Sequence, residues 1–109
     1  MRISWSLALG SLNGVVEEAR LCEAEGLDGV WFPDYQAPFS EWAELYVTLT
    51  TIALKTERIF LGSFVTDFLR RHPMVVAHAF ASLSHLAPGR AILGVGAGAG
   101  PAIHHLEYL

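Results

Sequence analysis

The chain has 109 residues, enough for one small domain, and 52% of them are hydrophobic while only 17% are charged. This composition excludes a disordered chain, and a net charge of −4 with scattered basic residues argues against a nucleic-acid surface. No apolar run approaches the roughly 18 residues that a membrane-spanning helix needs. The chain start lacks the pattern of a secretion signal, and the single Cys22 cannot form an internal disulfide, so we expect a cytoplasmic location.

The first third of the chain predicts a strand followed by a helix. Residues 1–9 alternate and then run apolar, which indicates a first strand. Ser11 or Asn13 can cap the helix that follows, in which apolar residues recur at helical spacing and include Cys22 as a buried core residue. Gly26 is typical of the position just after a helix end.

A second strand and helix come next. Gly29–Phe32 reads as a short buried strand that Pro33 ends, and Asp34 follows at its carboxyl end. Ser40 can cap the second helix. We expect this helix to bury a stripe formed by Trp42, Leu45, Leu49 and Ile52.

The third strand leads into a polar loop. Residues 59–64 predict a buried strand, and Pro73 suits the first turn of a third helix. A turn at residues 88–89 then leads to a fourth strand at residues 91–95. The apolar face of the third helix comprises Val76, Ala79, Phe80, Leu83 and Leu86.

Several polar residues in this part allow more than one interpretation. His78 and His85 are better read as a solvated helix face than as a metal pair, because no third ligand joins them. Arg70, Arg71 and His72 can reach a phosphate or an acidic substrate, or can be surface charges that end the loop. We favour the surface role for Arg71 and leave Arg70 open.

The order βαβαβαβ with apolar strands predicts a parallel α/β sheet, for which two architectures compete. Gly94, Gly96 and Ala99 fit the dinucleotide pattern G-x-G-x-x-A of a Rossmann-type nucleotide binder. Only ten residues follow Ala99, however, so the acidic residue expected about 20 residues later has no place. The favoured architecture is a TIM-barrel-type sheet, with residues 1–109 as the first half of the barrel.

Three segments in order resemble the bacterial luciferase-like flavin monooxygenases, and within them the branch that uses the deazaflavin F420. The family's first-helix-to-second-strand signature is similar to EEARLCEAEGLDGVWFPD. Its second helix, third strand and following loop are similar to LTTIALKTERIFLGSFVTDFLRRHP. Its third helix and fourth strand are similar to FASLSHLAPGRAILGVGAGAG. The resemblance covers nearly the whole chain and implies a flavin- or F420-dependent oxidoreductase or monooxygenase.

The resemblance also implies a cofactor site at the carboxyl ends of the strands, with F420 and FMN both open. Several family members carry a non-proline cis peptide in the third-strand bulge, and the matching bond is Phe64–Val65, with Ser63 beside it. Thr66 matches a position that contacts the cofactor. The backbone positions that match in the same way, where small residues let the chain approach a flat ring, are Gly96, Ala97 and Gly98.

For the catalytic residues, the resemblance points to the end of the second strand. Asp34 matches an acidic residue near the reacting ring edge, and Tyr35 stands where F420-dependent sugar dehydrogenases have a catalytic histidine. A glutamate common after the fourth strand in those enzymes is replaced by Ala99 or Gly100. These departures argue against sugar dehydrogenation, while hydride transfer or monooxygenation needs mainly ring positioning.

A half barrel leaves its first and fourth strands as open edges and its inner face uncovered. We therefore expect a second protein chain as partner, either a copy of this chain or another half barrel, besides a small-molecule substrate. The alternatives are an incomplete, inactive piece of the enzyme and a non-catalytic oligomerising scaffold.

Overall fold

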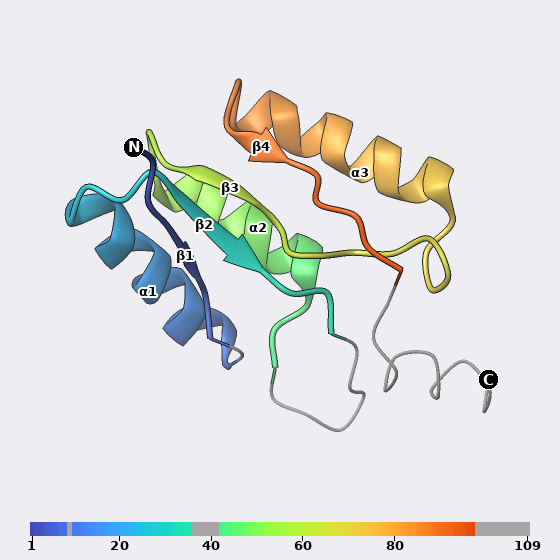
Figure 1. The fold of residues 1–109 in the computed structure, drawn as a ribbon, viewed down its shortest axis with the longest axis horizontal. Helices are drawn as coiled ribbons and strands as arrows, with labels where there is room; N and C mark the ends of the chain where they lie inside the picture. Colours follow the sequence, from blue (N-terminus) through green and yellow to red (C-terminus); the bar gives the residue numbers. More distant parts are fainter. Residues whose placement is uncertain (9, 36–41, 98–109) are drawn as a thin grey trace.

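The computed structural model describes residues 1–8, 10–35 and 42–97, and within them strands and helices alternate as predicted (Figure 1). The order is β1 (Ser4–Ser6), α1 (Leu12–Ala24), β2 (Gly29–Phe32), α2 (Leu45–Lys55), β3 (Phe60–Ser63), α3 (Pro73–Leu86) and β4 (Ala91–Ile92). None of the helices in these ranges is long and apolar enough to cross a bilayer.

The four strands form one parallel sheet in the order β1-β2-β3-β4. A Rossmann-type unit requires a strand order that departs from the order along the chain, so the sequential order contradicts that alternative. Sequential parallel strands joined by helices are the arrangement of a TIM-type barrel. Ala99, on which the dinucleotide pattern depended, lies outside the described residues.

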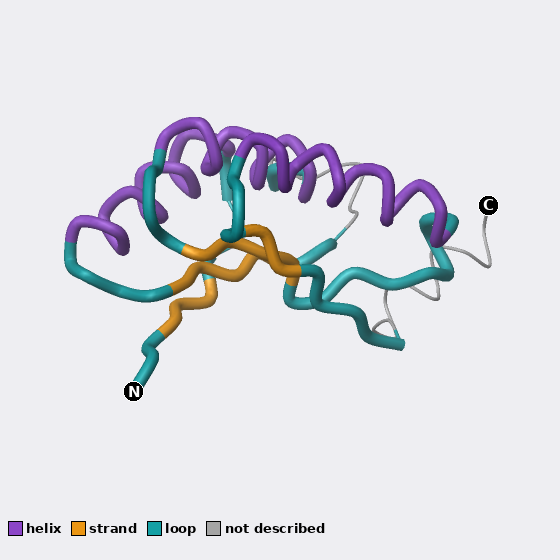
Figure 2. The backbone as a smooth tube through the Cα atoms, turned by 90° about the horizontal axis from the view of Figure 1, so that it is seen from above, coloured by secondary structure: helices purple, strands orange, loops and turns teal. Residues whose placement is uncertain are grey.

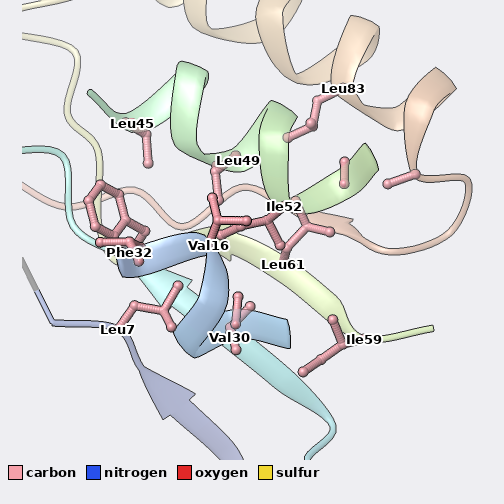
Figure 3. Packing of buried hydrophobic residues seen from close by; sticks show 14 of the residues in the cluster. Leu7, Val16, Val30, Phe32, Leu45, Leu49, Ile52, Ile59, Leu61 and Leu83 are labelled. Carbon is pink, nitrogen blue, oxygen red and sulfur yellow. The ribbon is translucent and has the colours of Figure 1, made fainter. Parts of the chain in front are cut away.

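The three helices lie on one face of the sheet, as Figure 2 shows from the side. The row Val30 and Leu61 points into this helical layer, where it meets Leu49 and Ile52 of α2 (Figure 3). Each such side chain contributes about 1.5–3 kcal/mol when it is fully buried. No helix of the described residues covers the opposite face, so the core has two layers.

Helix α1 begins and ends where the sequence predicts. The Ser11 hydroxyl accepts the Gly14 N–H at 3.3 Å, which decides between the two candidate caps. Gly26 has a φ of 84°, the left-handed conformation that glycine adopts readily after a helix. Cys22 is buried, as predicted, and burial raises the pKa of its thiol.

The predicted start of the second helix is wrong. α2 begins at Leu45 and is capped by the Glu44 side chain, which accepts the Val47 N–H at 3.0 Å. Trp42 lies before the helix instead of in its buried stripe, and Ser40 lies outside the described residues. The remaining stripe residues, Leu45, Leu49 and Ile52, are buried as predicted.

Three strands are shorter than predicted. β1 covers only Ser4–Ser6, β3 only Phe60–Ser63, and β4 only Ala91–Ile92. Regular pairing of β3 with β4 stops because the Ser63 hydroxyl takes up both backbone groups of Gly94, accepting its N–H and donating to its C=O. Pairing resumes only as a single bridge at Thr66.

Helix α3 starts at Pro73, as predicted, with the His72 ring accepting the Met74 N–H. Its buried face consists of Val76, Phe80 and Leu83. Ala79 is only partly buried and Leu86 is 45% exposed, although we expected both in the core, and Ala87 is buried just beyond the helix end. His78 and His85 are exposed, in agreement with a solvated face. Within the described ranges no group of three potential metal ligands occurs.

Candidate functional site at the carboxyl edge

The loop after β3 and the segment after β4 run together beyond the sheet, as Figure 1 shows. Thr66 joins them, because its N–H donates to Gly94 O at 2.9 Å and its C=O accepts the Gly96 N–H at 2.8 Å. β2 joins β3 in the same region, where the Phe64 N–H donates to Phe32 O at 3.0 Å. The carboxyl ends of three strands therefore meet at one edge.

An exposed apolar surface lies at this edge, which we call the shelf and define as Phe64, Val65 and Val95. Their side chains are 62%, 37% and 43% exposed. The Phe64–Val65 peptide, the bond that the family resemblance singled out, is cis, which settles a point that the sequence left open. The shelf therefore exposes apolar side chains from the loop after β3 and from the segment after β4.

Two glycines after β4 allow close packing against the end of β3 and the loop that follows it. A Cβ on Gly94 would lie 2.2 Å from the Ser63 carbonyl oxygen, and one on Gly96 would lie 2.5 Å from Cγ2 of Val65. The packing of the described chain therefore already requires glycine at both positions. Of the other backbone positions predicted to contact a cofactor, Ala97 is exposed and Gly98 lies outside the described residues.

Asp34, only 6% exposed, forms the centre of a polar cluster beneath the shelf. Its Oδ2 accepts the Thr66 hydroxyl at 2.6 Å and Nε of Arg71 at 3.0 Å. Its Oδ1 accepts the terminal Nη2 of Arg71 at 3.1 Å. Such a forked guanidinium–carboxylate pair is among the stronger polar contacts in proteins.

Arg71 connects this cluster to α2. Its Nη2 also donates to the Glu44 cap, and its guanidinium carbon lies 4.6 Å from the centre of the Tyr46 ring. Burial alone lowers the pKa of Arg71, but hydrogen bonds and charges from Asp34 and Glu44 outweigh burial and raise it. Arg71 is therefore a largely buried cation, its side chain 16% exposed, with two carboxylate partners, which corrects our expectation of a surface charge.

Arg70 forms a second buried pair. Its Nε donates to Oδ2 of Asp67 at 2.8 Å, and its terminal nitrogen donates to the backbone oxygen of Asp34. Asp67 also accepts the N–H groups of Leu69 and Arg70, both at 2.9 Å. Burial raises the pKa of Asp67, but its bonds to Arg70 and the loop N–H groups outweigh burial and lower it. Arg70 thus belongs to the fold of the loop.

Among the other predicted residues, Thr66 bonds directly to the cluster, whereas Tyr35 and Ser63 have other partners. Tyr35 packs edge-to-face against Trp42, with ring centres 5.1 Å apart, and is half-buried. Ser63 and Thr66 are fully buried, so their side chains serve the packing of the edge in this structure.

Sequence reasoning missed the roles of Glu44, Tyr46 and Asp67. Their partners lie on other elements or depend on the shape of the loop, so no local spacing pattern could have revealed them.

Nearly the whole chain is similar to part of a known protein family. The profile of the luciferase-like monooxygenase family matches residues 2–107. An F420-dependent glucose-6-phosphate dehydrogenase from Kineococcus radiotolerans is 46% identical over 84 residues, which are 70% of this chain and 24% of that protein. The chain spans about a quarter of the length of the curated relatives that it matches.

Two solved structures show the same arrangement of strands and helices. An F420-dependent secondary alcohol dehydrogenase in complex with an F420–acetone adduct is 26% identical, with a TM-score of 0.78 over 90% of this chain and 32% of that one. The oxygenating constituent of 3,6-diketocamphane monooxygenase from Pseudomonas putida, in complex with FMN, is 21% identical. Its TM-score is 0.82 over 97% of this chain and 32% of that chain. The described fold thus corresponds to about a third of such TIM-barrel-type chains.

Proposed function

Because the chain belongs to the luciferase-like monooxygenase family, we propose that it provides one wall of the cofactor site of an F420- or FMN-dependent oxidoreductase. The shelf is the observation that carries this proposal. Phe64, Val65 and Val95 present exposed apolar surface at the carboxyl edge of a parallel sheet, where α/β barrels place their sites. The bound ring would accept or deliver a hydride, and the chain's own residues orient it and exclude water.

The described residues fit the ring of such a cofactor better than its anionic tail. The shelf is apolar and open, whereas the two arginines at this edge, Arg70 and Arg71, are both committed to carboxylates. The one guanidinium nitrogen of Arg70 that has no partner among the described residues, Nη1, is buried within the loop and closed to solvent. We therefore assign ring contact, and no phosphate contact, to residues 63–96.

Of the two cofactors we propose F420, since the curated relative from Kineococcus radiotolerans and the secondary alcohol dehydrogenase named above are both F420-dependent. Hydride transfer to or from a small organic substrate is the corresponding reaction class. Tyr35 in the place of a catalytic histidine leads us to propose a substrate other than a sugar phosphate.

Titration of the 109-residue chain with F420 and, separately, with FMN tests the proposal. We expect quenching or a shift of F420 fluorescence that saturates, with a smaller response to FMN. Val65→Glu places a charge on the shelf and should abolish the response. Val47→Glu makes the same substitution at an exposed position of α2 and should keep the response. Absence of a response to both cofactors contradicts the proposal, and a response to FMN alone reverses the choice of cofactor.

A second candidate function, an oligomerising half-barrel scaffold, is favoured by the bare face of the sheet (Figure 2). The row Trp31, Gly62 and Ile92 alternates with the buried row and so points away from the helices. We propose that a second chain, either a copy or another half barrel, covers this face. Light scattering after gel filtration should give at least the mass of a dimer for the chain alone, and a stable monomer would count against self-association.

A further inference from the structure

The carboxylate of Asp34 has three of its roughly four acceptor sites occupied by partners from the same chain. Its two oxygens accept three hydrogen bonds, from the Thr66 hydroxyl and from two nitrogens of Arg71. The side chain is also 2% exposed. A general acid or base must come within hydrogen-bond reach of the atom it serves, either directly or through one water. A carboxylate that is this deeply buried and already bonded to Thr66 and Arg71 is suited to holding its partners in place.

The same bonds link Asp34 to the backbone that carries the shelf. The Thr66 hydroxyl that donates to Asp34 belongs to the residue whose N–H and C=O hold Gly94 and Gly96. Thr66 directly follows Val65, and Gly94 and Gly96 flank Val95. Moving the Asp34 carboxylate therefore moves the backbone on both sides of the shelf.

Arg71 sets where that carboxylate lies. Its guanidinium is held by Glu44 at the start of α2 and by the face of the Tyr46 ring, so its position is fixed from outside the loop. A planar guanidinium with several fixed donors orients a carboxylate more narrowly than a lysine ammonium would. The chain of contacts runs from α2 through Arg71 and Asp34 to Thr66.

We propose that Asp34 and Arg71 are positioning residues, which fix the shelf through Thr66, and that neither carries a proton in the reaction. This inference rests on the proposed function for what the shelf binds, but the positioning itself is a property of the free chain. It replaces the catalytic role that the family resemblance suggested for Asp34. It also adds Arg71, with Glu44 behind it, to the residues that determine cofactor affinity.

Backbone amide signals of the ¹⁵N-labelled chain test the positioning without a cofactor. Asp34→Asn and Arg71→Met should each shift the amides of Val65, Thr66 and Gly96, and the double variant should shift them by less than the sum of the two. Arg71→Lys should shift the same three amide signals by less than Arg71→Met does. The control Arg20→Met removes an exposed pair with Glu17 on α1 and should leave these amides unchanged.

Two results would overturn the positioning role. One is that Arg71→Met leaves the three amides in place, and the other is that the shifts of the single variants simply add. If Arg71→Met fails to fold, Arg71→Lys takes its place as the test, because lysine keeps the positive charge and loses only the two-pronged hydrogen bonding to Asp34. Unchanged amides in that variant count against the proposal, and an intermediate displacement supports it.

Cofactor titration then separates positioning from proton transfer. Asp34→Asn and Arg71→Met should weaken F420 binding alike, by about tenfold or more, as coupled positions commonly do. An unchanged affinity in both would contradict the positioning of the shelf. If the unmodified chain binds neither F420 nor FMN, the proposed function fails, while the amide shifts still decide the positioning.

Discussion

The two edges of the sheet are held together by different kinds of polar contact. At the amino edge, the Glu23 carboxylate accepts the N–H groups of Glu57, Arg58 and Ile59 at 3.1, 2.9 and 2.9 Å, and so ties α1 to the start of β3. Arg90 there donates to backbone and hydroxyl oxygens at the end of α2 and before β3. At the carboxyl edge, by contrast, Asp34 and Arg71 bind each other.

This difference in contacts suggests that the two edges have different roles, one in stability and one in function. The charged groups at the amino edge complete backbone groups that would otherwise lack partners, which serves stability. The charged groups at the carboxyl edge pair in a buried cluster and leave an apolar shelf exposed above it. In barrel enzymes, residues at the amino edge mainly serve stability, whereas the active site lies at the carboxyl edge.

The largest effect should come from breaking the carboxyl-edge pair. Asp34→Ala leaves the buried Arg71 guanidinium with Glu44 as its remaining carboxylate partner and should lower the free energy of unfolding by about 3–5 kcal/mol, since an uncompensated buried charge is costly. Urea unfolding followed by circular dichroism measures this. Glu17→Ala, which breaks an exposed pair, is the matched control and should change stability by less than about 1 kcal/mol. Equal effects of the two variants would show that the cluster is not a stabilising unit.

A methyl group at Gly94 should act almost as strongly, but locally. Its Cβ would lie 2.2 Å from the Ser63 backbone oxygen, so the backbone of the carboxyl edge must move. Overpacking of this kind costs about 1–3 kcal/mol. Thermal unfolding measures the loss, and Gly14→Ala is the control, because its nearest neighbour is a side-chain hydroxyl at 3.2 Å. A Gly94→Ala chain as stable as the control would mean that the edge tolerates this movement.

At the amino edge, Glu23→Gln should cost about 2 kcal/mol. The amide oxygen still accepts hydrogen bonds, but bonds from backbone N–H groups to a charged acceptor contribute more than bonds to a neutral one. Urea unfolding at neutral pH measures the change, with Glu25→Gln, an exposed residue at the end of the same helix, as control. A loss no larger than that of the control would show that the charge of Glu23 is unimportant.

The pH dependence of the same variant sharpens the comparison. Burial raises the pKa of Glu23, but the N–H groups of Arg58, Ile59 and Glu57 and the charge of Arg58 outweigh burial and lower it. A carboxyl whose pKa is lowered by folding adds stability above its unfolded pKa, and this stability is lost as the pH falls through the folded value. Unfolding free energies measured from neutral pH downward should therefore fall less steeply for Glu23→Gln than for the unmodified chain. Parallel curves would contradict the assignment.

Local patterns in the sequence were sufficient for most of the fold. Pro73, Gly26 and the apolar spacing are local signals, so they marked the start of α3, the end of α1 and most of the buried faces correctly. The start of α2 was misplaced because Glu44, not Ser40, caps it. Glu44 is held by Arg71, a residue 27 positions later.

The candidate site was only partly predictable. The resemblance led to the Phe64–Val65 bond, which needed family knowledge because no spacing pattern marks it. The Asp34–Arg71 pair spans 37 residues and forms only when β2 and the loop after β3 meet. Sequence reasoning therefore found the carboxyl edge but assigned Asp34 to chemistry and Arg71 to the surface.

The smallest change tests the link between the buried cluster and the shelf. Thr66→Val keeps the shape of the side chain but removes the hydroxyl that donates to Asp34 at 2.6 Å, and should cost about 1–1.5 kcal/mol. Thr66→Ser keeps the hydroxyl and should lose less. Thr51→Val, whose hydroxyl bonds only to its own helix at Val47, is the control in urea unfolding. If the Thr66 link fixes the shelf, Thr66→Val should also weaken F420 binding more than its stability loss predicts, whereas Thr51→Val should not affect binding. Equal binding by both variants would mean that the carboxyl edge, like the amino edge, serves stability alone.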